Sequence, residues 1–503
     1  MEFFSKLHIQ ALKGTLIRGT LLLTIAGFIT RIIGFFYRVF LADHLGETLL
    51  GIYQLIFPIY GICFTIYAAG IQTAISQKIA ANTRTGEEKR KTDRKIFFYG
   101  LSLSLFLAIF LSFLLYFLAQ PIADSFLLEP ACAPYLKILS LLFPFCGTSA
   151  CINGYFYGKK RAKVPAVSQM IEQLARVGSV LFLCTLLHAK GEFGCQIAVF
   201  GVVVGEFVAC AYNVFKLFKE FSLRSLLHIR KKRKNLLHSA EQTTSHALSE
   251  ASFHILSKRN RKKGIFFSLL FLSGTLTGTK LILALLHSVE AVFIPAALKK
   301  YGYSSEEALA LFGVFSGIAL PFILFPSTVT NSFAVMLLPS IAEAHAGGNM
   351  KQIRNYVTKS GKYSLLIGYL FTALFLLSGN FCGTVFFHSP DAGYFITSLS
   401  FLCPFLYLST TFTSIINGLG KTGLTFFITT LSLLVKIFFL IVLVPEYGIQ
   451  AYLTGTLLSQ MIMTIWEWYY LRNYMELSTK KYLLYPVTFF ILLGMLLGKS
   501  GFF

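Results

Sequence analysis

Two arginines interrupt the first long apolar run of the chain. Arg31 and Arg38 stand seven residues apart, so they share one face of a helix. The run holds no acidic residue that could neutralise them, and Asp43 follows only at its end. A guanidinium group binds phosphate oxygens through a fork of N–H donors. The pair therefore predicts a binding site for a phosphate-bearing anion.

A lysine occupies a comparable place in the second half of the chain. Lys280 follows a polar strip, Gly274–Thr279, which we expect to line water or to pack closely on a neighbouring helix. Lys436 lies inside a later apolar run, and we expect no acidic residue at its depth. A charge in hydrocarbon costs at least about 2.5 kcal/mol, so each cation must face a cavity, a partner or an interface. We predict that Lys280 joins the two arginines as a substrate contact and that Lys436 is a weaker one.

A further cation has acidic neighbours. Glu172 precedes Arg176 by one helical turn, and Glu206 in the next apolar run reaches the same predicted depth, about 18 Å along its helix. Such a set can be a structural ion pair or a proton relay. We favour the ion pair, because an acidic residue one turn away can neutralise a buried cation.

The chain has no recognisable catalytic or metal-binding motif. Gly420-Lys-Thr422 resembles the end of a phosphate-binding loop, but Ile415 stands where that loop requires glycine. HExxH and GxSxG are absent, no acidic pair has catalytic spacing, and the nine cysteines form no CxxC pair. We therefore predict a transporter and not an enzyme, with no cofactor, metal ion or redox centre.

The composition is typical of an all-α integral membrane protein. Of the 503 residues, 55% are hydrophobic and 13% are charged, whereas a soluble protein carries roughly 25% charged residues. Apolar runs of about 20 residues recur, and each is long enough to cross about 30 Å of hydrocarbon as a helix. A β-barrel would show short alternating strands instead. We expect about thirteen spans, at 15–41, 50–79, 96–119, 135–157, 165–188, 194–217, 265–289, 308–337, 361–386, 393–417, 424–445, 449–472 and 482–498.

The distribution of positive charge indicates the orientation. The net charge of +23 arises from Lys and Arg in alternate loops, which is the signal of membrane topology and not of nucleic-acid binding. We predict a multi-pass protein of a bacterial cytoplasmic membrane with a cytoplasmic N-terminus, whose first run is a retained span and not a signal peptide. This orientation leaves few basic residues in outer loops: Lys137, Lys190, Lys299, Lys300 and Lys499.

One long polar segment divides the chain. Its basic clusters, Arg230–Lys234 and Lys258–Lys263, fit a flexible linker or a surface that binds anionic lipid headgroups on the cytoplasmic face. We favour the linker, and either role keeps the clusters near the anionic leaflet. The predicted division is a six-helix lobe at 1–217, the linker at 218–264, a second six-helix lobe at 265–472 and an additional helix at 473–503.

The two lobes repeat several motifs in the same order. Phe143-Pro-Phe145 and Ile152-Asn-Gly154 recur as Cys403-Pro-Phe405 and Ile416-Asn-Gly418. Because six spans is an even number, the repeats have the same orientation, and transporters of this kind place the substrate between them. Four prolines inside spans are predicted hinges for rocking between open states, with simple kinking as the alternative: Pro58, Pro144, Pro326 and Pro404.

Longer strings resemble the stage V sporulation protein B family over nearly the whole chain, to about residue 475. They are Gly27-Phe-Ile-Thr-Arg-Ile-Ile-Gly-Phe-Phe-Tyr-Arg38, Gly51-Ile-Tyr-Gln-Leu-Ile-Phe-Pro-Ile-Tyr60, Gln169-Met-Ile-Glu-Gln-Leu-Ala-Arg-Val177 and Ala319-Leu-Pro-Phe-Ile-Leu-Phe-Pro326. This family lies within the multidrug/oligosaccharidyl-lipid/polysaccharide (MOP) exporters, with MurJ-type lipid II flippases. The resemblance implies a MATE/MurJ-like two-lobed bundle of thirteen or fourteen helices, alternating access, and a substrate-binding role for the first-span arginines.

The same resemblance implies a function. We expect a flippase that moves an undecaprenyl-pyrophosphate-linked saccharide, such as a lipid II-like cell-wall precursor or a polysaccharide repeat, here for spore cortex, and that acts as a monomer. Where we expect an arginine on the seventh span, this chain has Lys280, and the eleventh span offers Lys436 and no acid, which speaks against sodium coupling. The alternatives are a cation-coupled multidrug exporter, which predicts acids in the first-lobe cavity, and a sporulation membrane scaffold, which leaves the buried cations unexplained.

Overall fold

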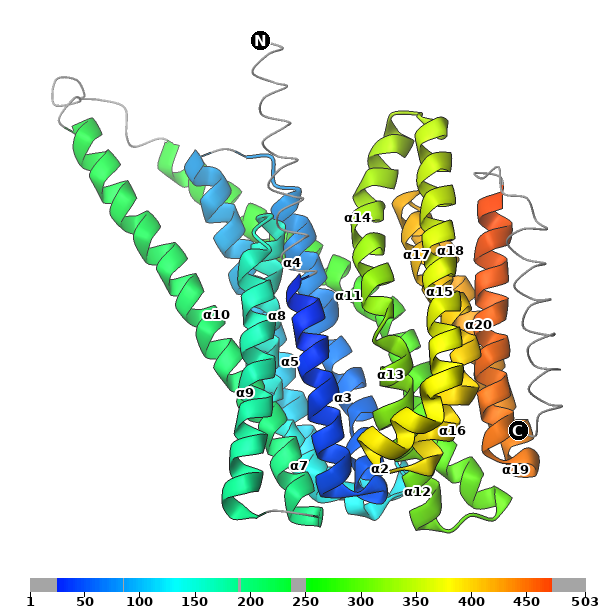
Figure 1. Cartoon of the computed structure of the whole chain (residues 1–503). Helices are drawn as coiled ribbons and strands as arrows, with labels where there is room; N and C mark the ends of the chain where they lie inside the picture. Colours follow the sequence, from blue (N-terminus) through cyan, green and yellow to red (C-terminus); the bar gives the residue numbers. More distant parts are fainter. Residues whose placement is uncertain (1–24, 85, 189–190, 237–249, 473–503) are drawn as a thin grey trace.

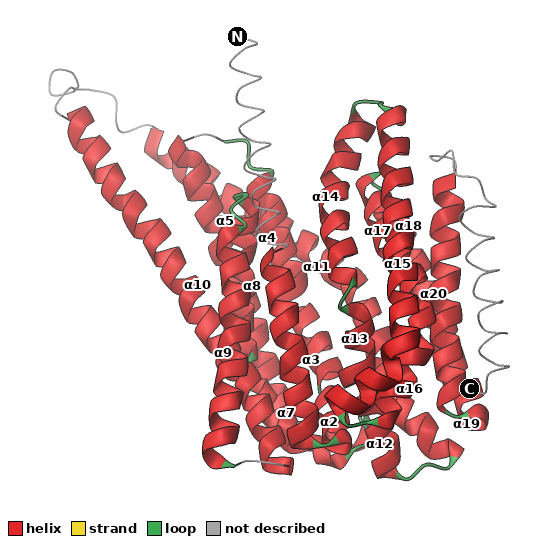
Figure 2. Cartoon of the chain, in the orientation of Figure 1, coloured by secondary structure: helices red, strands yellow, loops and turns green. Residues whose placement is uncertain are grey.

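The computed structural model describes residues 25–84, 86–188, 191–236 and 250–472, and within these ranges the regular structure is all helical, joined by short loops and turns (Figure 2). A first helix covers Ile25–Leu45. It is followed by α2 (Glu47–Leu55), α3 (Phe57–Phe64), α4 (Gly70–Ala80), α5 (Gly86–Phe117), α6 (Ala119–Ser125), α7 (Ala133–Ser140), α8 (Phe143–Gly158), α9 (Lys163–Leu187), α10 (Gly191–Leu236), α11 (Glu250–Tyr301), α12 (Ser305–Gly313), α13 (Leu320–Leu324), α14 (Ser327–Ala346), α15 (Met350–Phe387), α16 (Pro390–Leu399), α17 (Cys403–Gly418), α18 (Thr422–Phe438), α19 (Val444–Tyr447) and α20 (Ile449–Leu471).

Ten of the described helices are long and apolar enough to cross a membrane, or eleven if the bent pair Pro130–Ser140 and Phe143–Gly158 forms one span. The multi-pass membrane class is therefore confirmed, but the count of thirteen is not. The twelfth expected span corresponds to α20, which is not among the ten. Its buried face carries polar groups, including Thr456, Ser459 and Glu467, which suit packing inside a bundle better than contact with lipid. The thirteenth expected span, 482–498, lies outside the described residues.

The helices form two lobes, one from the first helix to α10 and one from α11 to α20 (Figure 1). In the first lobe α9 packs along α10 and α4 along α8, and in the second α15 packs on α16 and α17. Large apolar side chains cover the outside: Phe117, Phe271 and Leu377 are 73%, 79% and 89% exposed. Such an exposed apolar surface fits a bundle that lies in hydrocarbon.

All four predicted hinge prolines lie at breaks between helical segments. Pro58 follows the break between α2 and α3, and Pro326 precedes α14. Pro144 begins α8, which is bent by 52° from the preceding segment, and Pro404 begins α17 after a short 3₁₀ turn. Proline lacks the N–H that would continue the helical ladder, so each break has a local cause. Whether the breaks act as hinges stays a prediction.

The two lobes meet closely at the lower end of Figure 1, where α2 crosses α12. A Cβ atom at Gly313 would lie 2.5 Å from the carbonyl oxygen of Glu47, and one at Gly51 would collide with the carbonyl of Leu309. Only glycine allows two helix backbones to approach this closely. Helix α11 belongs to the second lobe but also packs along α3 and α4 of the first.

Most of the predicted linker is helical. Residues 218–236 continue α10 and residues 250–264 belong to α11, while 237–249 lie outside the described residues. The expected loop boundaries at 218 and 264 therefore differ from the structure. Lys, Arg, Leu and Ala are good helix formers, and the polar composition that suggested a loop is equally compatible with solvated helix ends.

Candidate functional site

A cavity of about 600 Å³ lies between the lobes. The first helix, α2, α3 and α9 line it from one lobe, and α13, α14 and the end of α15 from the other. Three arginines line it (Arg31, Arg38 and Arg176), together with one carboxylate, that of Glu172. The rest of the polar lining is neutral and includes Tyr37, Gln54, Gln169, Gln173, Ser327 and Asn331. The balance of charge in the cavity is positive.

Arg31 faces this cavity from the first helix and is held from the opposite lobe. Its Nη1 donates to Oγ1 of Thr328 at 2.9 Å and to Oγ of Ser327 at 3.4 Å. Both acceptors are neutral hydroxyls, and no ion pair to Arg31 occurs in the part of the chain that the structure describes. A guanidinium carries five N–H donors, so Arg31 keeps further capacity to bind an anion.

Arg38 lies two helical turns further along the same face and lines the same cavity. Its side chain is half-buried, and Arg176 and Arg31 are near enough to repel it electrostatically. Among the described residues no carboxylate forms an ion pair with it. The expectation that Arg31 and Arg38 share a face and lack acidic partners therefore agrees with the geometry.

Arg176 forms an ion pair with Glu172 on α9, one turn away. The predicted structural pair is thus present, and it lines the cavity instead of lying apart from it. Glu206 on α10 is 8% exposed and lies within electrostatic range of both partners, without a direct ion pair to Arg176 in the described residues. The role of Glu206, relay or structural, stays a prediction.

Lys280 is not in the lining of this cavity. Its Nζ donates to the carbonyl oxygen of Ala69 and to Oγ1 of Thr73, both at 2.9 Å, across the interface with the first lobe. In the preceding strip Thr277 packs closely on α4, because a Cβ at Gly70 would collide with it, whereas Gly274, Thr275, Gly278 and Thr279 are exposed. Of the two predicted roles for the strip, close helix packing is observed at Thr277, while the exposed positions leave the role of lining water a prediction. The structure does not bring Lys280 together with Arg31 and Arg38 in one cavity.

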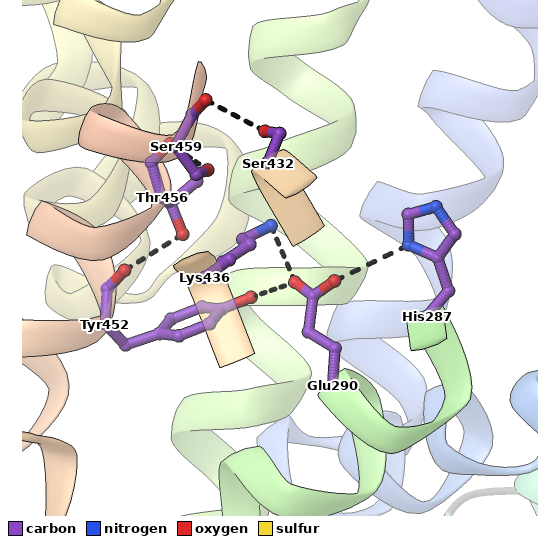
Figure 3. A network of polar contacts seen from close by, with 7 residues as sticks. All are labelled: His287, Glu290, Ser432, Lys436, Tyr452, Thr456 and Ser459. Carbon is purple, nitrogen blue, oxygen red and sulfur yellow. Dashed lines mark hydrogen bonds and ion pairs between the residues drawn. The ribbon is translucent and has the colours of Figure 1, made fainter. Parts of the chain in front are cut away.

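The expectation that Lys436 has no acid at its depth is wrong. Its Nζ lies 2.6 Å from Oε1 of Glu290, and the hydroxyl of Tyr452 donates to the same oxygen at 2.6 Å (Figure 3). Oε2 of Glu290 lies 3.5 Å from Nδ1 of His287. The sequence reading ended this apolar run at 289, whereas α11 continues to Tyr301 and carries Glu290 inside the lobe. A neutralised ammonium is a poor candidate for a substrate contact, so we interpret Lys436 as part of a structural ion pair.

Sequence reasoning missed the neutral polar groups of the cavity. Gln169, Gln173 and Arg176 follow one another at four and three residues, so they share one face of α9 with Glu172. That spacing was a usable signal, because a polar stripe on an otherwise apolar helix indicates a lined cavity. Thr328 and Asn331 had no comparable signal. In the described residues no group of three His, Cys, Asp or Glu side chains could hold a metal ion.

Comparison with known proteins agrees with this architecture. The family described as "Polysaccharide biosynthesis protein" matches residues 16–301, more than half of the chain. Stage V sporulation protein B of Bacillus subtilis (strain 168) is 24% identical over 456 residues, which cover 90% of this chain and 83% of that protein. Lipid II flippase MurJ of the same organism is 24% identical over 430 residues, covering 82% of this chain and 74% of MurJ.

Solved structures share the fold. An inward closed conformation of a lipid II flippase MurJ superposes with a TM-score of 0.64 at 15% identity, covering 94% of this chain and 92% of that one. An inward-facing MATE-family multidrug transporter of the MOP superfamily gives a TM-score of 0.61 at 15% identity, covering 88% and 94%. The predicted MATE/MurJ-like class is thus confirmed at the level of the fold.

Proposed function

We propose, because the chain belongs to the polysaccharide biosynthesis protein family, that it is a flippase for an undecaprenyl-pyrophosphate-linked saccharide. Its relatives and its fold make it a flippase or exporter of the MOP superfamily. Within that class, the headgroup would enter the cavity between the lobes while the lipid tail stays in the bilayer. Alternating exposure of the cavity to the two membrane faces would complete the transfer.

The observation that carries this proposal is the pair of cavity arginines without acidic partners in the described residues. Arg31 and Arg38 line the same cavity from one helix face, and the one lining carboxylate, Glu172, is engaged by Arg176. Cations without acidic partners are costly in a low-dielectric interior, so they favour an anionic guest. Pyrophosphate fits this requirement, since guanidinium groups bind its oxygens through paired donors.

The same charge balance speaks against the alternatives. A multidrug exporter of cationic compounds needs carboxylates in its cavity, and the lining offers one that is already neutralised. A membrane scaffold without transport gives no reason for a polar cavity of about 600 Å³ between the lobes. The cavity is formed within one chain, which supports a monomer as the working unit.

Several finer features belong to the proposal. The N-terminus lies in the cytoplasm of a bacterial cell, as the loop charges indicate. The basic ends of α10 and α11 then lie near the anionic leaflet, where such clusters attract lipid headgroups. The resemblance to a stage V sporulation protein supports spore cortex peptidoglycan as the destination of the precursor.

Complementation of a bacterium depleted of its lipid II flippase tests the proposal. The wild-type chain should restore growth, while Arg31→Ala and Arg38→Ala should not, although all three proteins reach the membrane in equal amounts. Lys351→Ala is the matched control, because that lysine is exposed at the start of α15 and lies outside the cavity. Equal rescue by both arginine variants would refute the arginine site. Failure of the wild type should be followed by the same assay in a sporulating strain lacking its stage V relative, with cortex as the readout.

A further inference from the structure

Among the cations that bond across the interface between the lobes, Arg31 and Lys280 make similar contacts. Arg31 on the first helix donates to Thr328 on α14 of the second lobe, and Lys280 on α11 donates to Thr73 on α4 of the first lobe. Lys280 follows Arg31 by 249 residues and Thr328 follows Thr73 by 255, whereas the repeated motifs are 260 and 264 residues apart, so the two contacts are alike in kind and not in strict repeat register. Each lobe therefore supplies one cation, which donates to a threonine of the other lobe.

Each contact has a second acceptor beside the threonine. Ser327 lies 3.4 Å from Nη1 of Arg31, and the carbonyl of Ala69 lies 2.9 Å from Nζ of Lys280. Ala69 ends a π-helical turn, Thr65–Ala69, within the segment that joins α3 to α4. Both cations are thus held by neutral oxygens of the opposite lobe, and movement of the lobes apart must break these bonds.

The two contacts differ in their access to the cavity. Arg31 lines it, and so does Ser327 on the accepting side. Lys280, Thr73 and Ala69 are absent from the lining. An anion that enters the cavity can therefore reach the guanidinium of Arg31, but it finds the ammonium of Lys280 packed against the other lobe.

We infer that Arg31–Thr328 and Lys280–Thr73 are a matched pair of latches between the lobes, and that an anionic headgroup in the cavity releases only the first. The release rests on the proposed function, whereas the latches themselves do not. A guanidinium binds a phosphate group through paired N–H donors and opposite charge, which two neutral hydroxyls cannot match, so phosphate oxygens displace the hydroxyls of Thr328 and Ser327. The Lys280 latch stays closed and keeps α11 against α4.

Cysteine pairs placed beside each latch report its state. Phe28→Cys with Phe325→Cys spans the Arg31 side, where the two rings lie 6.0 Å apart between centroids. Lys78→Cys with Ser268→Cys spans the same α4–α11 contact as the Lys280 latch, about 18 Å from Lys280 along α11. There the Lys78 ammonium donates to Ser268 at 2.5 Å, a bond that this pair of substitutions removes. The purified full chain is treated with a short bifunctional thiol reagent, and the parent chain without the added pair is the background control, because its nine cysteines are buried.

Loss of a threonine hydroxyl should open its own latch. Without ligand, Thr328→Val should lower the crosslinking rate of the Phe28/Phe325 pair roughly 2- to 10-fold, as expected for one lost hydrogen bond, and leave the Lys78/Ser268 pair unchanged. Thr73→Val should do the reverse. Thr328→Ser and Thr73→Ser keep the hydroxyl and should behave as the parent, which separates a latch from general misfolding. Unchanged crosslinking in both valine variants overturns the latches.

Inorganic pyrophosphate tests the release. Added to the parent chain, it should lower crosslinking of the Phe28/Phe325 pair and leave the Lys78/Ser268 pair as it was. Equal loosening of both pairs, or of neither while pyrophosphate binds by calorimetry, overturns selective release. If the two valine variants loosen their latches but pyrophosphate does not bind, the latches are retained. Their release by the headgroup is then overturned, and the result counts against the proposed anionic substrate.

Discussion

Lys436 and Glu290 neutralise each other within the second lobe, and the hydroxyl of Tyr452 completes the set. Glu290 is 7% exposed, so water contributes little to the solvation of its carboxylate. Removal of one partner from a buried ion pair leaves an uncompensated charge, which costs about 3–5 kcal/mol, whereas replacement of both by similar neutral groups is often tolerated.

Glu290→Gln should therefore lower the thermal unfolding temperature of the purified protein more than the double variant Glu290→Gln/Lys436→Met. The single variant strands the ammonium of Lys436, while the double variant removes both charges at similar volume. Thermal unfolding followed by intrinsic fluorescence in detergent measures both. A double variant that unfolds at a lower temperature than the single variant would contradict the stranding of the Lys436 ammonium as the cause of destabilisation.

Arg31 should depend on its forked shape as well as on its charge. Arg31→Lys keeps the positive charge but loses bidentate binding, so pyrophosphate affinity should fall about tenfold while the overall fold is retained. Titration calorimetry of the purified chain with pyrophosphate gives this number, with Lys351→Arg as the control at an exposed site. Affinity equal to that of the parent would mean that Arg31 acts as a point charge.

At this scale, helix periodicity predicted part of the site. Seven-residue spacing placed Arg31 and Arg38 on one face, and four-residue spacing paired Arg176 with Glu172. Helix periodicity could not predict partners that lie on other helices. Glu290 meets Lys436 because α11 and α18 are neighbours in space, and Thr328 meets Arg31 because two lobes face each other.

Among the elements, the crossing of α2 over α12 is the closest approach of the two lobes at the lower end of the bundle in Figure 1. Gly51 and Gly313 face each other's helix backbone there, and neither leaves room for a Cβ atom. In the proposed orientation this end is the outer one, so we expect the crossing to close the cavity to the outside.

Gly51→Val should force this crossing apart and expose the cavity from outside. A cysteine at Gln173 of the lining should then react with a membrane-impermeant maleimide in intact cells several-fold faster than in the parent, because the added side chain displaces α12. Gly61→Val in α3 is the matched control, since a Cβ atom there meets nothing within 4 Å. Equal labelling in all three proteins would show that the crossing does not seal the cavity.

The elements themselves follow from simple sequence signals where proline or glycine acts locally. The prolines marked the breaks between helices correctly, because a missing N–H disrupts any helix. The boundaries of α10 and α11 were wrong, because a polar run of Lys, Arg and Leu is compatible with a helix that leaves the membrane. The expected span at 449–472 coincides with α20, whose polar side chains are buried against neighbouring helices.

For the whole molecule, composition and motif repetition were sufficient to predict a two-lobed helical bundle, whereas the exact number of spans was not confirmed. The repeat also explains why cations recur in both lobes. The cations of the two lobes have different surroundings, however. Arg31, Arg38 and Arg176 line the cavity, while Lys436 is neutralised and Lys280 bonds across the interface. A positive cavity and a neutral second-lobe pair together bear on the energy source of transport.

Transport should respond to the membrane potential and not to sodium. An inside-negative potential favours outward movement of an anionic headgroup by about 2.3 kcal/mol per charge for each 100 mV. The carboxylate of Glu290 already accepts from Lys436 and Tyr452, so it is not free to bind a sodium ion. In proteoliposomes carrying the chain and a fluorescent lipid-linked saccharide, collapse of a potassium-diffusion potential should slow transfer, while replacement of sodium by choline should leave the rate unchanged. The control is Arg31→Ala, which should transfer nothing under either condition. A rate that falls with sodium removal at constant potential would contradict this account, because it would require a cation site that the Lys436 ammonium does not occupy.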